Sequence, residues 1–131
     1  MKVIDLSQEL YDQMPVYPGD PEVHIQQIHD IEKEGWRLRY LQFSSHIGTH
    51  ADVFSHMDKT GMSLSDISIE RFMGKTILIN PEDIFPKDLG LAFMEGNLDM
   101  PLFEKLQKVS PLFIIVGNTA TISVELERAL L

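Results

Sequence analysis

The sequence predicts a mixed α/β fold, and two kinds of observation support this class. Short runs rich in aliphatic and β-branched residues occur at 75–80 (KTILIN) and 112–116 (LFIIV), as expected for buried strands. Helix start signals precede the segments that follow Asp99 and Ser123. With 131 residues, of which 44% are hydrophobic, we expect a single domain over residues 1–131.

The composition excludes several classes of protein. The absence of cysteine rules out disulfides, cysteine-ligated zinc sites and thiol nucleophiles, and it fits a reducing cytoplasm. The net charge of −9 repels the phosphates of nucleic acids. No apolar run approaches the ~20 residues that span a bilayer, and Asp5 argues against a secretory signal. We therefore expect a cytoplasmic protein that binds neither nucleic acid nor membrane.

The N-terminal half is predicted to form strands separated by turns. Residues 1–6 are expected to form a short first strand, and the proline-rich residues 12–21 a rigid loop. A further strand is expected in the first half of residues 23–31, before Gly35 breaks the chain. Over residues 36–43, apolar and polar side chains alternate with one slip, which is typical of a half-buried strand with a bulge or bend.

The C-terminal half is predicted to contain two helices. The first is expected over residues 99–109, with its first residue, an aspartate, as the N-cap and a proline in the first turn. The second begins near Ser123 and ends on Leu130 and Leu131, with no C-cap residue. Two leucines at the end of a solvated helix indicate either a partner subunit that covers them or a chain that continues further.

Side chains suited to metal chemistry are concentrated in one short segment. Three of the five histidines fall within residues 46–56, where uniform scatter would place about 0.4. The segment contains the pattern H-x3-H-x-D-x3-H, formed by His46, His50, Asp52 and His56. Imidazole and carboxylate ligands suit Zn²⁺ or Mn²⁺. The other two histidines, His24 and His29, are expected to be ordinary surface or strand residues.

A shared metal ion constrains the backbone of this segment. In a straight strand, His46 and His50 would lie about 13 Å apart, at ~3.3 Å per residue, which is too far to bind one ion. On a regular helix these two histidines would share a face, but Asp52 would lie well around the cylinder. The metal site therefore requires a strand that ends in a tight bend, and Gly48 supplies the permissive backbone. The alternative is a surface loop that is rich in histidine by chance, and the spacing favours the metal site.

These residues resemble the signature of a known family. Residues 46–56 (HIGTHADVFSH) are similar to the H-x-G-T-H-x-D-x-P-x-H motif of the cyclase family, which includes the bacterial arylformamidases (kynurenine formamidases) and the isatin hydrolases. Residues 4–7 (IDLS) and 14–21 (MPVYPGDP) match its N-terminal signature. Gly61 and residues 72–75 (FMGK) fall where the family has its next loop and strand.

The resemblance implies an α/β fold of the swivelling β/β/α type, with a mixed, barrel-like sheet flanked by helices. It also implies a divalent metal, zinc or manganese, bound by His46, His50 and Asp52. By motif position, His56 would bind a second metal or act as the catalytic general base. The implied activity is hydrolysis of an amide bond, in an N-formyl or cyclic amide, by a metal-activated water.

Three features depart from the family's pattern. Phe54 replaces the proline of D-x-P-x-H, and the chain is shorter than most family members. No histidine follows His56, whereas the family has a histidine and a glutamate ligand in its last third. The side chains available near the expected place of that histidine are Glu125, Glu127 and Arg128. The loss of two ligands disfavours a second metal and leaves His56 available as a base.

Three hypotheses follow. The first is a metal-dependent amidohydrolase of the arylformamidase type that acts on a small molecule, as a homodimer or higher homo-oligomer. The second is a catalytically impaired relative that binds a metal or ligand or serves as an oligomer subunit. The third is a small acidic α/β domain with an accidental histidine loop. Trp36, Tyr40 and Tyr17 are candidates for an aromatic substrate wall, although we favour core packing for each. The sequence assigns no substrate-binding residue.

Overall fold

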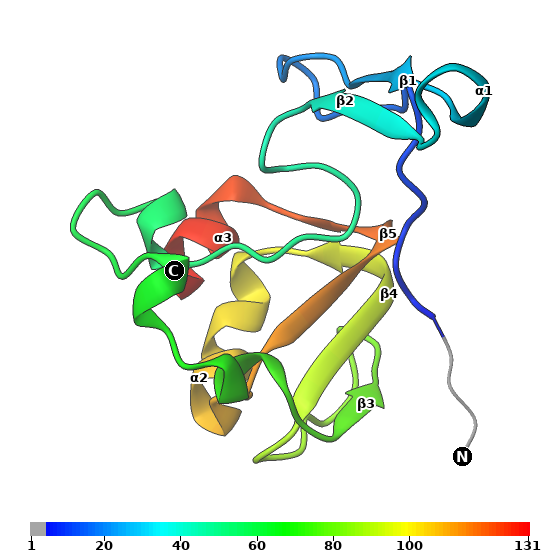
Figure 1. The fold of residues 1–131 in the computed structure, drawn as a ribbon. Coiled ribbons are helices and arrows are strands. Elements are labelled where there is room, and N and C mark those ends of the chain that lie inside the picture. The colour runs from blue at the N-terminus through cyan, green and yellow to red at the C-terminus, as the bar shows by residue number, and fades with distance from the viewer. Residues whose placement is uncertain (1–4) are drawn as a thin grey trace. The chain divides into compact units, whose positions relative to one another are not determined.

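The computed structural model describes residues 5–131 and confirms the mixed α/β class (Figure 1). The chain divides into two compact units, Met1–Ala51 and Asp52–Leu131. Each unit has its own sheet and its own apolar core. The single domain expected over residues 1–131 stays a prediction. Most of the predicted first strand, residues 1–4, lies outside the described residues.

The first unit is built on an antiparallel pair of strands, β1 (His24–His29) and β2 (Leu38–Gln42). Between them lies α1 (Ile31–Glu34), a single turn whose N-cap, Asp30, accepts a hydrogen bond from the backbone of the turn. Gly35 ends the turn with φ 82°, the left-handed conformation that glycine adopts after a helix. The predicted break at Gly35 is thus confirmed.

Strand β2 differs from the expected half-buried strand. All five of its residues are exposed, and its pairing runs regularly through Tyr40 and Leu41, where a bulge was predicted. The irregularity lies instead in the partner strand, between Gln27 and His29. An alternating pattern leads to burial only where a second layer covers one face, and the buried core of this unit is small.

The predicted core packing of three aromatic residues is also wrong. The side chains of Tyr17, Trp36 and Tyr40 are each more than half exposed. The indole Nε1 of Trp36 donates a hydrogen bond of 2.9 Å to Nδ1 of His29. His29 is therefore an ordinary strand residue, as expected, with a polar contact to its neighbouring loop.

The second unit is built on a parallel sheet in the order β3-β4-β5. Its strands are β3 (Thr76–Leu78), β4 (Gly90–Leu98) and β5 (Ile114–Ile122). The runs at 75–80 and 112–116 therefore contain strands, as predicted, although β3 is an exposed edge strand and not a buried one. The described residues form two open sheets, and neither closes into a barrel. The swivelling, barrel-like arrangement stays a prediction.

The helical segments of the second unit include three 3₁₀ helices before the sheet, Phe54–His56, Leu64–Asp66 and Ile69–Phe72. The helix predicted over 99–109 begins as a fourth 3₁₀ helix, Met100–Leu102, and continues as α2 (Phe103–Val109). Asp99 is the N-cap, as predicted, although its side chain makes no capping hydrogen bond. Its backbone carbonyl oxygen accepts a hydrogen bond of 3.0 Å from Leu102 N.

The last helix, α3 (Val124–Leu130), begins as predicted. Ser123 is its N-cap, and the hydroxyl oxygen of Ser123 accepts a hydrogen bond from Leu126 N at 3.2 Å. Among the described residues, no helix has the length and apolar character needed to cross a bilayer.

Helices α2 and α3 contact each other and cover the core of the parallel sheet (Figure 1). The largest fully buried side chains of this core are Leu91, Phe93, Leu98, Leu106 and Leu126. Leu130 packs against the same core. The chain's own sheet and helices therefore cover part of the surface of Leu130, and a partner subunit at this end stays a prediction.

Candidate metal centre

Residues 46–52 bring two imidazoles and a carboxylate together. One ligating atom from each of His46, His50 and Asp52 lies within 4.8 Å of the other two. The ring centroids of His46 and His50 are 4.8 Å apart, and the ring planes are tilted by 40°. A straight strand would separate these histidines by about 13 Å. The predicted bend is therefore present.

The bend depends on Gly48. Its φ of 57° lies in the left-handed region, where a side chain is strained. A Cβ atom at this position would also lie 2.5 Å from Cδ2 of Leu10. Strand β2 ends at Gln42, and the bend spans residues 45–49. The bend was expected where the strand ends. It lies instead in the loop that follows β2, and this loop carries His46 and His50.

Two contacts on either side of the bend hold this loop. Ile47 is buried and packs in the core of the first unit with Met14 and Val23. The hydroxyl oxygen of Thr49 accepts a hydrogen bond of 2.9 Å from the backbone nitrogen of Gln8. The N-terminal segment, which includes Met14 of the family-like residues 14–21, thus contacts the histidine loop and supports its bend.

The orientation of His50 is fixed by a backbone carbonyl. Nδ1 of His50 lies 3.1 Å from the carbonyl oxygen of Gly48. A carbonyl oxygen can only accept, so Nδ1 bears the proton in this contact. The lone pair of the neutral ring is then on Nε2. Metal-binding histidines commonly donate their second ring nitrogen in this way, which sets the tautomer that binds the ion.

The three side chains fit a divalent ion. Zinc–ligand distances of about 2.0–2.2 Å place tetrahedral ligand atoms roughly 3.3–3.6 Å apart. The observed spread of up to 4.8 Å exceeds this by no more than about 1.5 Å, which side-chain rotation can close. Two imidazoles with one carboxylate match both zinc and manganese.

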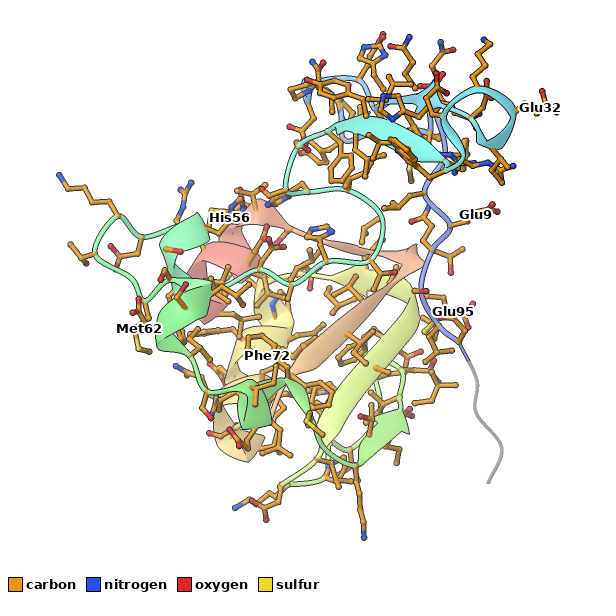
Figure 2. The ribbon with its side chains drawn as sticks, in the orientation of Figure 1. Glu9, Glu32, His56, Met62, Phe72 and Glu95 are labelled. Atoms are coloured by element: carbon orange, nitrogen blue, oxygen red, sulfur yellow. The ribbon has the colours of Figure 1, made fainter. Side chains whose placement is uncertain are left out.

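His56 is not part of this three-residue group. It ends the 3₁₀ helix Phe54–His56, and Figure 2 shows it beside α3. Nε2 of His56 lies 3.9 Å from Oε1 of Glu127, and the two side chains are 32% and 20% exposed. In the sequence, Glu127 is only one of three side chains near the expected place of the family's late histidine, and no pattern assigns it a role. His56 and Glu127 are too distant in the sequence for a periodic pattern to reveal their contact. The one signal in the sequence is that Glu127 lies near the expected place of the family's late metal ligands.

Phe54 occupies a backbone position that also suits the family's proline. It is the first residue of its 3₁₀ helix, where proline is tolerated. Val53 before it is extended, with φ −133° and ψ 168°, the conformation that a following proline favours. A Cβ atom on Gly61 would lie 2.6 Å from the carbonyl carbon of Phe54, which explains the glycine there.

Hydrogen bonds lower the pKa of two exposed carboxyl groups near this turn. The hydroxyl and backbone N–H of Ser63 both donate to Asp66, and they lower the pKa of Asp66 below its ordinary value. The backbone N–H and hydroxyl of Thr60 likewise lower the pKa of Asp58. These contacts close local turns at the surface and stabilise the loops that follow His56.

A family model and several known proteins match most of the chain. The model of the Cyclase family, described as Putative cyclase, matches residues 4–108. A kynurenine formamidase of Maricaulis maris (strain MCS10) is 31% identical over 100 residues, which are 72% of this chain and 48% of that protein. A kynurenine formamidase of Bacillus anthracis is 33% identical over 99 residues, 72% of this chain and 47% of that protein.

A kynurenine formamidase of Salinibacter ruber (strain DSM 13855 / M31) is 27% identical over 118 residues, which are 85% of this chain and 55% of that protein. The chain thus spans about half the length of these relatives. The family match covers most of the chain and includes the whole histidine segment. This protein belongs to the Cyclase family.

Proposed function

We propose that the chain acts as a metal-dependent hydrolase of the arylformamidase type, which cleaves the N-formyl or cyclic amide bond of a small molecule. The observation that carries this proposal is the convergence of His46, His50 and Asp52, whose ligating atoms lie within 4.8 Å of one another. The matched relatives are named kynurenine formamidase, which supports the same class of reaction.

In this proposal, His46, His50 and Asp52 bind one zinc or manganese ion. When bound, such an ion lowers the pKa of a water molecule toward about 7 and polarises the carbonyl of the substrate. His50 presents Nε2 to the ion, because its Nδ1 donates to the carbonyl of Gly48. The carboxylate of Asp52 offsets part of the ion's positive charge.

His56 is the proposed general base. Its imidazole takes a proton from the attacking water as the new C–O bond forms. The same ring then returns the proton to the nitrogen of the leaving amine as the C–N bond breaks. The products are a carboxylic acid and an amine, or one ring-opened molecule that carries both groups. Imidazole suits both proton transfers because one ring nitrogen can accept a proton and later donate it again.

A hydrolase assay tests the proposal. Formanilide and isatin are supplied to the protein with Zn²⁺ or Mn²⁺, and the loss of substrate is followed by absorbance. We expect turnover that disappears in His50→Ala and His56→Ala and persists in the control His24→Ala, which changes a histidine outside the cluster. Full turnover by His50→Ala, or by protein stripped of metal, would contradict the proposal.

The second candidate is a catalytically impaired relative that binds a metal or ligand or serves as an oligomer subunit. The observation that favours it is Phe54, which stands in place of the proline of the family's motif and adds a bulky ring beside the cluster's segment. Metal binding without turnover of an N-formyl anilide, an isatin or a lactone is the outcome that this candidate predicts and the hydrolase proposal does not.

The proposal extends to fold, assembly and location. It includes the swivelling β/β/α arrangement with a barrel-like sheet, a cytoplasmic location, and a homodimer or higher homo-oligomer. Exposed apolar side chains support the assembly, among them Ile31, Trp36 and Leu41 of the first unit. Sedimentation velocity tests the proposed assembly. We expect a particle with the mass of two or more chains, and a monomer at all concentrations would contradict the proposed oligomer.

A further inference from the structure

We propose that Glu127 is a positioning residue for His56, whose imidazole it orients through Nε2 and whose charge it balances when the ring takes up a proton. The inference rests on the proposed role of His56 as a base. It assigns a task to a carboxylate in α3 that neither the family motif nor the sequence pattern assigned.

The contact between the two side chains is suited to this task. The distance of 3.9 Å between Nε2 of His56 and Oε1 of Glu127 is within the range of an ion pair and longer than a hydrogen bond. Catalytic hydrogen bonds are often long in a free enzyme and shorten when the substrate binds. The side chains of His56 and Glu127 are 32% and 20% exposed, so water screens the pair less than it screens a fully exposed ion pair.

The backbone on both sides of the pair is held in place. Glu127 lies in the first turn of α3, where its N–H donates to the carbonyl oxygen of Ser123 at 3.0 Å. The preceding residue, Leu126, is fully buried in the core. The N–H of His56 donates to the carbonyl oxygen of Val53 at 2.8 Å. Because each side chain extends from ordered local structure, the contact does not depend on a loose loop.

The chemistry of a carboxylate decides which ring nitrogen can accept the proton. An ionised glutamate only accepts hydrogen bonds, so the neutral ring of His56 facing Glu127 carries its hydrogen on Nε2. Nδ1 then holds the lone pair and is the atom that takes the proton from water. A carboxylate that orients a histidine base and stabilises the imidazolium is a recurring arrangement in hydrolases.

Glu125 provides a matched control for Glu127. It lies in the same first turn of α3, so both side chains interact with the helix dipole in the same way. Glu125 is exposed, whereas Glu127 is partly buried against His56. Glu125→Gln therefore removes the same charge from the same helix turn without changing the group that faces His56.

The experiment combines kinetics with NMR of the histidine ring. Turnover of formanilide in the presence of Zn²⁺ is measured for the wild type, Glu127→Gln, Glu125→Gln, His56→Ala and the double variant His56→Ala/Glu127→Gln. Nitrogen-15 shifts of the His56 ring are recorded for the wild type and the two single glutamate variants. A far-ultraviolet circular dichroism spectrum checks that each variant is folded.

We expect Glu127→Gln to lower kcat roughly tenfold to hundredfold with little change in KM, because Glu127 acts on the base and not on the substrate. The double variant should be no slower than His56→Ala, since Glu127 acts through His56. The ring shifts of His56 should change in Glu127→Gln and stay at their wild-type values in Glu125→Gln.

Unchanged ring shifts in Glu127→Gln, or equal kinetic effects of the two glutamate variants, would overturn the inference. So would a further loss of rate in the double variant relative to His56→Ala. If the wild type hydrolyses no substrate, the proposed function fails and the positioning role fails with it. In that case, His56 ring shifts that change in Glu127→Gln would show that the two side chains are in contact although the protein is not a hydrolase. Failure of the proposed function is thereby distinguished from failure of the contact.

Discussion

Nδ1 of His50 lies 3.1 Å from the carbonyl oxygen of Gly48, so the backbone of the bend itself orients an expected metal ligand. The same glycine turns the chain and determines which nitrogen of His50 bears the lone pair. Ile47 and Thr49 hold the bend against the N-terminal segment. The conformation of the loop and the orientation of the ligand are therefore linked.

Gly48→Ala is expected to damage both stability and metal binding. The left-handed backbone alone costs about 1–2 kcal/mol for a residue with a side chain, and the added methyl group would meet Leu10. Gly35→Ala is the control, because its φ is 82° and a Cβ there would meet none of the described residues within 4 Å. Urea unfolding and zinc titration of both variants are the measurements. Equal effects of the two changes on zinc affinity would contradict the account.

Leu126→Ala is expected to destabilise the second unit by about 2–5 kcal/mol, because it removes a fully buried side chain and leaves a cavity. Val124→Ala, at an exposed position of the same helix, should change stability by roughly 0.5 kcal/mol or less. Chemical denaturation followed by circular dichroism compares the two variants. A loss of similar size in both would mean that α3 does not pack on the sheet as described.

Ser63→Ala is expected to raise the pKa of Asp66 toward its ordinary value, because it removes the hydroxyl hydrogen bond that lowers this pKa most. The backbone N–H of residue 63 remains and continues to lower the pKa of Asp66 in part. The pKa of Asp66 is lower in the folded state than in the unfolded state. The contact therefore stabilises the fold above the ordinary pKa, and this contribution is lost as the pH falls through the lowered value.

The Ser63→Ala variant should consequently lose less stability on acidification than the wild type. Carboxyl carbon NMR titration measures the pKa of Asp66, and Asp58 provides the internal control because a separate residue, Thr60, lowers its pKa. An unchanged pKa of Asp66 in Ser63→Ala would show that the hydroxyl contact is absent in solution.

Phe54→Pro should be at least as stable as Phe54→Ala. Both changes remove the same aromatic ring, but proline fits the first position of the 3₁₀ helix after the extended Val53. Proline at a compatible position adds about 0.4–1 kcal/mol by restricting the unfolded chain. Thermal unfolding of the two variants provides the comparison. A proline variant that unfolds at a lower temperature than the alanine variant would refute the described backbone.

Local signals in the sequence predicted part of the fold. The N-cap of α3 at Ser123 was predictable because capping depends on residues within one helix turn. The runs that contain β3 and the start of β5 were predictable from composition. Strand β4 was missed because Gly90–Leu98 contains polar residues and a second glycine and shows no regular alternation, although its first half is buried at the centre of the sheet.

Local signals also predicted the metal cluster but not its surroundings. His46, His50 and Asp52 lie within seven consecutive residues, so a single bend brings them together. The contact of His56 with Glu127 joins distant segments and depends on how α3 packs. The exposure of β2 was equally hidden, because alternation does not reveal whether a second layer of structure exists to cover a strand.

The most direct test of the account is a calorimetric titration with Zn²⁺ and Mn²⁺ of the wild type, His50→Ala and His24→Ala. We expect binding of about one ion per chain by the wild type and by His24→Ala, and loss of that binding in His50→Ala. Absence of binding by the wild type at generous concentrations of both metals would contradict it, and so would undiminished binding by His50→Ala.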